Sequence, residues 1–116
     1  MTSPFRTPLA ESIFRQRYSQ GRTWLENSER LVQEVCSGLL SKGECDELVS
    51  YINEMKFIPA GRYLYYAGQE ANFYNNCYCF KGEEDTREEW ARLTHDAMAS
   101  LMSGGGIEIV TGKQLL

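Results

Sequence analysis

The chain has 116 residues, with 12 Lys and Arg against 16 Asp and Glu, and a net charge of −4. This length bounds it to one small domain at most, and its acidic balance lacks the clustered basic surface that binds nucleic-acid phosphates. No apolar run approaches the roughly 20 residues of a membrane span, and residues 1–11 lack the basic-then-apolar pattern of a signal peptide. We therefore expect a cytoplasmic protein that binds neither nucleic acid nor membrane.

The first 56 residues predict a helical N-terminal region. Apolar residues spaced three and four apart predict a short helix over 9–18. Thr23 and Glu26 have the spacing of a capping box, which predicts a second helix ending near Gly38 or Gly43. Ser41 with Glu44 predicts the start of a third helix, whose apolar stripe ends at Ile52.

The pattern changes at Phe57. Residues 57–68 have no helical period, and Pro59-Ala60-Gly61 should interrupt any regular element. The next stretch, ANFYNNCYCF, is rich in aromatic residues and asparagine. Thr86 should cap a last helix that ends at the glycine triplet 104–106, and residues 107–116 predict a short strand and a tail.

Two cysteines are the sharpest chemical candidates. Cys77 and Cys79 point to the same face if they lie on a strand, because strand side chains alternate. They are open to two interpretations, a redox thiol in polar surroundings or small apolar residues of a half-buried strand. No Cys-x-x-Cys pattern is present and His95 is the single histidine, so no metal site is expected.

Two loops carry weaker signals. Ser103-Gly104-Gly105-Gly106 closes a helix, whereas phosphate-binding glycine loops open one. It is therefore either a flexible helix end or a place where a ligand approaches the backbone. Pro59-Ala60-Gly61-Arg62 is either a plain turn or an anion contact made by amides and a guanidinium.

Taken in order, these segments resemble one family. The chain contains PLAESIFRQRYSQ, TWLENSERLV, FIPAGRYLYYAG, NNCYCF, EEDTREEW and LMSGGGI over about residues 8–107. They resemble the N-terminal part of a ribonucleotide reductase large subunit, most closely the adenosylcobalamin-dependent class II type of phages and cyanobacteria. The resemblance implies an α+β fragment, in which N-terminal helices precede the first strands and a helix of an incomplete ten-stranded α/β barrel. It divides the chain into a helical region 1–56, the start of the barrel at 57–107 and a divergent tail at 108–116.

The resemblance also implies roles for individual residues. Cys77 corresponds to the first cysteine of the pair that reduces the ribonucleotide, and Cys79 has no implied role. The implied substrate contacts are Ala60, Gly61, Asn76, Gly105 and Gly106. The resemblance further implies adenosylcobalamin as the cofactor, a ribonucleotide as the substrate and a thioredoxin-like protein as the reductant. If a phage encodes the chain, the expected location is the cytoplasm of the host cell.

The sequence departs from the family inside its last motif. Glu108 stands where the family has a glycine, and the radical-bearing cysteine, the second cysteine of the pair and the cobalamin-binding part are absent. We interpret this as a reading frame interrupted by an intron, an intein or a gene split. The chain would then act only with a separately encoded C-terminal reductase piece. The alternative is a non-catalytic remnant or a small helical interaction protein.

Overall fold

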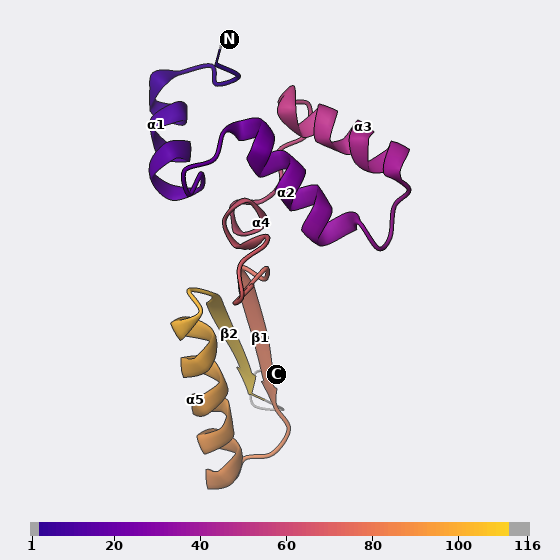
Figure 1. Cartoon of the computed structure of the whole chain (residues 1–116). Coiled ribbons are helices and arrows are strands. Elements are labelled where there is room, and N and C mark those ends of the chain that lie inside the picture. The colour runs from indigo at the N-terminus through magenta and orange to yellow at the C-terminus, as the bar shows by residue number, and fades with distance from the viewer. Residues whose placement is uncertain (1–2, 112–116) are drawn as a thin grey trace. The chain divides into compact units, whose positions relative to one another are not determined.

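The computed structural model describes residues 3–111 and contains helices and two parallel strands in two compact units (Figure 1). The first unit ends at Tyr74 and the second begins at Asn75. The elements of the first unit are α1 (Pro8–Arg17), α2 (Trp24–Cys36), α3 (Lys42–Asn53) and α4 (Gly61–Tyr66). Those of the second are β1 (Cys77–Gly82), α5 (Arg87–Met102) and β2 (Gly106–Thr111).

Helix starts follow the capping chemistry of the sequence. The Thr23 hydroxyl accepts from the Glu26 amide at 3.2 Å, and the Glu26 carboxylate accepts from the Thr23 amide at 2.7 Å. Ser41 and Glu44 repeat this reciprocal pair at the start of α3. Each box satisfies amides that the first helical turn leaves unpaired, so both predicted starts are confirmed. The helix α2 ends at Cys36 with Ser37 as its C-cap, close to Gly38, the earlier of the two predicted ends, and Leu39 lies exposed beyond it.

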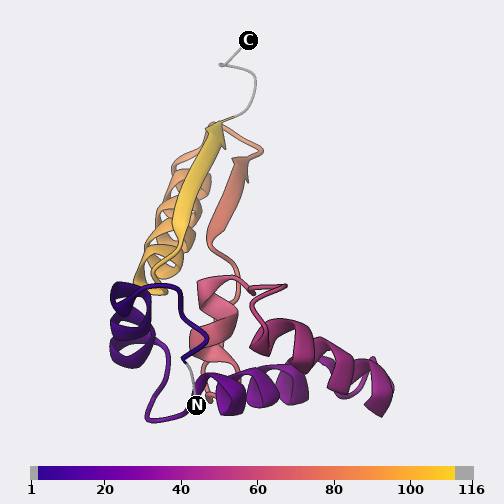
Figure 2. The ribbon, with the colours of Figure 1, turned by 90° about the horizontal axis from the view of Figure 1, so that it is seen from above.

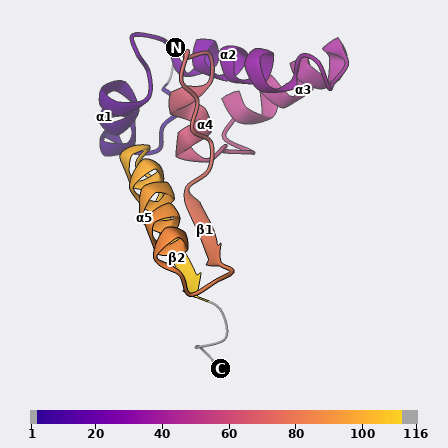
Figure 3. The same ribbon diagram turned by 90° about the horizontal axis from the view of Figure 1, so that it is seen from below.

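The first unit has an aromatic core. The Phe14 and Trp24 rings meet edge to face at 5.2 Å, and Phe5 lies 5.2 Å from Phe14 and 5.5 Å from Trp24. The Trp24 indole donates to the Ile52 carbonyl at 3.0 Å, which ties α2 to α3, and the two helices run alongside each other (Figure 3). The buried cluster comprises Phe14, Trp24, Leu31, Val32, Ile52, Leu64 and Ala67. This core gives the N-terminal helices their own packed interior.

Residues 57–68 differ from the expectation, because they contain the helix α4. Ala60 begins the helix without a side-chain cap. Leu64 and Ala67 are 7% and 0% exposed and belong to the core of the first unit. Burial of these two side chains outweighs the weak local helix signal, as tertiary packing commonly does. The segment 57–74 therefore groups with the N-terminal helices, whereas the sequence predicted a boundary at 56/57.

A buried amide joins α2 to α4. Asn27 is 0% exposed, and its side chain donates to the Leu64 carbonyl at 3.4 Å. Its carbonyl oxygen accepts from the Arg30 guanidinium at 2.9 Å. Desolvation lowers the pKa of Arg30, so this guanidinium depends on its few partners.

Asn27→Ala should destabilise the first unit by about 2 kcal/mol, because it removes two hydrogen bonds and leaves the Leu64 carbonyl and Arg30 short of partners. Urea denaturation of the full chain measures the change. Asn53→Ala at the end of α3 is the matched control and should cost less than about 0.5 kcal/mol. Equal midpoints for the two variants would contradict this role of Asn27.

The second unit is a parallel β–α–β arrangement. Strands β1 and β2 pair side by side from Cys77 opposite Gly106 to Gly82 opposite Thr111, and α5 lies along the sheet (Figure 2). Thr86 caps α5 as predicted, by accepting from the Glu89 amide at 3.2 Å. Leu93 and Ala97 are the buried residues of α5. The close approach of Gly82 to Leu93, 3.1 Å from where a Cβ would lie, marks the face of β1 that α5 covers.

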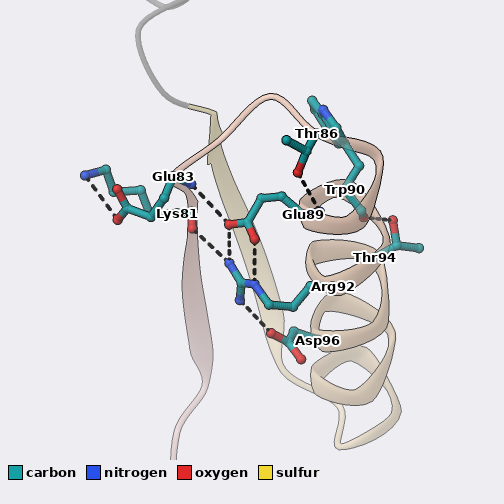
Figure 4. Close-up of polar contacts among 8 residues, drawn as sticks. All are labelled: Lys81, Glu83, Thr86, Glu89, Trp90, Arg92, Thr94 and Asp96. Atoms are coloured by element: carbon teal, nitrogen blue, oxygen red, sulfur yellow. Dashed lines mark hydrogen bonds and ion pairs between the residues drawn. The ribbon is translucent and has the colours of Figure 1, made fainter.

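A charged cluster fixes the start of α5 to the end of β1 (Figure 4). The Arg92 guanidinium donates to both oxygens of Glu89, at 2.6 and 2.9 Å, and to Asp96 at 3.0 Å. It also reaches the Lys81 carbonyl at 3.3 Å, while Glu89 accepts from the Glu83 amide at 3.1 Å. These bonds, first those from Arg92, lower the pKa of Glu89 to about 2.

Glu89→Gln should therefore reduce stability at pH 7 and make less difference in acid. The folded pKa lies below the unfolded one, so the carboxylate stabilises the fold above pH about 4.5, and this contribution disappears as the pH falls to about 2. Urea midpoints of both proteins between pH 7 and pH 2 test this. A gap between wild type and variant that stays constant over this range would contradict it.

Candidate functional site

The second unit brings Asn76, Cys77 and Gly106 together. Cys77 and Gly106 are partners in the parallel ladder. The Gly106 amide donates to the Asn76 carbonyl at 2.8 Å, which holds the two strands in this register. A Cβ on Gly106 would lie 3.3 Å from the Cys77 sulfur, a tighter approach than most such contacts. Glycine at this position therefore leaves the space beside the thiol open.

Gly105 is required by packing. A Cβ on Gly105 would lie 2.5 and 2.8 Å from two ring carbons of Tyr78, and 3.3 Å from the Ser100 carbonyl oxygen. The Tyr78 ring thus covers Gly105 and fixes the turn between α5 and β2. The sequence pattern did not single out Tyr78. The alternation of Tyr78 with Cys77 and Cys79 could have indicated that its ring lies on the opposite face of the strand from the thiols.

The amides of the glycine turn are used within the chain. Ser103 donates to Ala99 and Ser100, Gly104 to Leu101, and Gly105 to Ser100. Each bond satisfies a carbonyl at the C-terminus of α5. A ligand can therefore approach the backbone of this turn closely, but it cannot receive hydrogen bonds from these amides.

The two exposed thiols share the face that α5 does not cover. Strand alternation sets Cys77, Cys79 and Lys81 apart from Tyr78, Phe80 and Gly82. Both cysteines are exposed and free of disulfides. Because β1 is a strand, the conditional prediction that both thiols point to one face is confirmed. Glu108 pairs with Cys79 in register and is likewise exposed, so a carboxylate stands on this face beside the thiols.

Ala60 and Gly61 lie in the first unit, at the start of α4. Both are exposed, and a Cβ on Gly61 would come within 3.0 Å of the Tyr18 hydroxyl. The neighbouring Arg62 guanidinium donates to the Phe73 carbonyl at 3.2 Å. Packing against Tyr18 explains on structural grounds why a glycine occupies position 61. Arg62 helps to hold the chain segment that follows α4.

Within residues 3–111, no group of three or more His, Cys, Asp and Glu side chains is placed to hold a metal ion. His95 is exposed on α5 and contacts the Asp96 carboxylate at 3.2 Å. None of the helices in this part of the chain combines the length and the apolar character needed to cross a bilayer.

Fold and site together define a parallel β–α–β unit that presents a free thiol beside a glycine on its uncovered face. No protein-family model, curated protein or solved structure matches the chain.

Proposed function

We propose that this chain is the N-terminal piece of a ribonucleotide reductase that acts with a separately encoded C-terminal piece. The overall reaction consumes a ribonucleotide and two thiols and yields a deoxyribonucleotide, water and a disulfide. The 2′-hydroxyl oxygen leaves as water, and the thiol pair supplies the two electrons. Cys77 is one of these thiols and the C-terminal piece supplies the other.

The observation that carries the proposal is the meeting of Cys77 and Gly106 on one uncovered sheet face. A thiol that reduces a nucleotide must be accessible, and the substrate must come close to the backbone beside it. Cys77 is exposed, and Gly106 has no side chain between the thiol and a ligand. Asn76 is exposed next to both. Three residues that the family resemblance assigns to reductant and substrate contacts are thus neighbours.

The open two-stranded sheet also supports the proposal that a partner chain completes the fold. Parallel sheets are normally covered on both faces, and two strands rarely form a stable sheet alone. In the described part of the chain β1 and β2 pair only with each other, which leaves an edge of each strand unpaired. The uncovered face carries two thiols, an amine and a carboxylate, together with the apolar side chain of Val110, and is not a continuous apolar layer. Such a face suits the polar interior of a catalytic barrel better than a second helical layer.

The remaining components belong to the partner or to solution. The C-terminal piece would bind adenosylcobalamin, the source of the radical, and carry the radical-bearing cysteine. A thioredoxin-like protein would reduce the disulfide between Cys77 and the partner cysteine by thiol–disulfide exchange. Both pieces would work in the cytoplasm, or in the host cytoplasm if a phage encodes them.

Strand addition tests the proposed assembly. The purified chain is mixed with the C-terminal part of a class II reductase that begins after its glycine motif, and backbone hydrogen exchange is followed. We expect slower exchange at amides of β1 and β2 on mixing, because new strands pair with the open edges. Amides of α2 and α3 are the internal control and should not change. Unchanged exchange in β1 and β2 would contradict the assembly.

A helical interaction protein is the second candidate. The first unit has its own core, and it exposes large apolar side chains, including Leu9, Phe57 and Ile58. In that case the reductase piece would leave β1 and β2 unprotected, and any protection would appear in the first unit. The same exchange experiment therefore separates the two functions.

A further inference from the structure

The first unit contains a cavity of about 580 Å³ that the proposed function does not use. Its wall includes the edge-to-face rings of Phe5, Phe14 and Trp24. Ile13 and Ile58 also line it and are 45% and 59% exposed. The volume lies in the range of small-molecule sites, which are apolar with a few polar groups that orient the ligand.

Among the described residues of the lining, three side chains carry nitrogen or oxygen atoms, and all three are hydrogen-bond donors. Trp24 already donates to the Ile52 carbonyl at 3.0 Å. The Arg6 guanidinium and the Tyr18 hydroxyl form no hydrogen bond or ion pair with any residue of the described range 3–111. None of the described residues that line the cavity carries a carboxylate. The cavity thus combines aromatic walls with two unused donors, one of them permanently charged.

We propose that this cavity binds a small aromatic anion, an aryl carboxylate or sulfonate. Its ring would pack against the aromatic walls, where offset and edge-to-face contacts favour flat rings. Its anionic group would accept hydrogen bonds from Arg6 and Tyr18, since charge-assisted bonds to guanidinium are stronger than neutral ones. An organic cation would meet the charge of Arg6 with no carboxylate to balance it. The site lies within the first unit and does not depend on the reductase proposal.

Calorimetric titration of the full chain with 2-naphthoate and with its uncharged analogue 2-naphthylmethanol tests the proposal. We expect one site and about fivefold tighter binding of the anion, the upper end for an exposed charge pair. Arg6→Gln and Tyr18→Phe should each weaken 2-naphthoate severalfold and weaken 2-naphthylmethanol less, because its neutral hydroxyl accepts weaker hydrogen bonds than a carboxylate. Equal affinity for the two probes in the wild type would overturn the anion site.

Two further variants localise the binding. Ala10 also lines the cavity, and Ala10→Phe should fill it and abolish binding of both probes. Circular dichroism must show unchanged helix content for that variant; if it unfolds, Ile58→Asp at the exposed wall replaces it and should weaken 2-naphthoate at least tenfold. Met102→Gln, at an exposed apolar position of the second unit, is the control and should change nothing. Binding that survives cavity filling, or that is lost with Met102→Gln, would refute the location.

Discussion

Replacing Gly105 by alanine is expected to destabilise the β1–α5–β2 unit by about 3 kcal/mol. The new methyl group would lie 2.5 Å from the Tyr78 ring and 3.3 Å from the Ser100 carbonyl oxygen. The ring or the turn must move, because packed carbon atoms do not approach to 2.5 Å, and the approach to Ser100 is also tight. Hydrogen exchange of the β1 and β2 amides in the full chain measures the loss, since local unfolding of this unit exposes them.

Two further variants test whether the loss comes from the contact between Gly105 and Tyr78. Gly43→Ala in α3 meets no atom within 4 Å and should be neutral or stabilising by up to about 1 kcal/mol. Adding Tyr78→Ala to Gly105→Ala should recover part of the loss, because the obstructing ring is gone and the two changes are coupled. Additive effects of the two substitutions would contradict the Tyr78–Gly105 contact.

Cys77→Ser should lower the rate of deoxyribonucleotide formation by the two combined pieces about a hundredfold or more. This loss corresponds to an activation free energy raised by at least about 2.7 kcal/mol. A hydroxyl cannot take part in the thiol–disulfide step that supplies the two electrons. Because the Cys77 side chain is exposed and serine leaves the backbone pairing of β1 with β2 in place, association of the two pieces should be retained.

Cys79→Ser is the matched control for this loss. Cys79 lies two residues along the same face and is also exposed, but it has no role in the proposed reaction. Turnover should remain within a fewfold of wild type. A similar loss in both variants would contradict the assignment of the reductant to Cys77 alone.

The sequence predicted the elements whose signals are local. Thr23 with Glu26, Ser41 with Glu44, and Thr86 start helices through side chains that act within one turn. Alternation was enough to place both thiols of β1 on one face. Such signals survive folding because neighbouring residues carry them.

Other features depend on contacts between distant residues. Helix α4 forms because Leu64 and Ala67 enter the core of α2 and α3, which no local pattern of residues 57–68 indicates. The requirement for Gly105 comes from Tyr78, 27 positions earlier in a different element. The donors Arg6 and Tyr18 line one aromatic cavity only in the folded first unit. Residues 112–116, the end of the predicted tail, lie outside the described range.

The most direct test of the central claim is a reconstitution assay. The full chain and the C-terminal piece of a class II reductase are combined with adenosylcobalamin, a ribonucleotide and a dithiol, and deoxyribonucleotide is quantified. We expect product only when both pieces are present. No product, in a mixture where hydrogen exchange of β1 and β2 also stays unchanged, would contradict a split reductase and leave the helical interaction protein as the function.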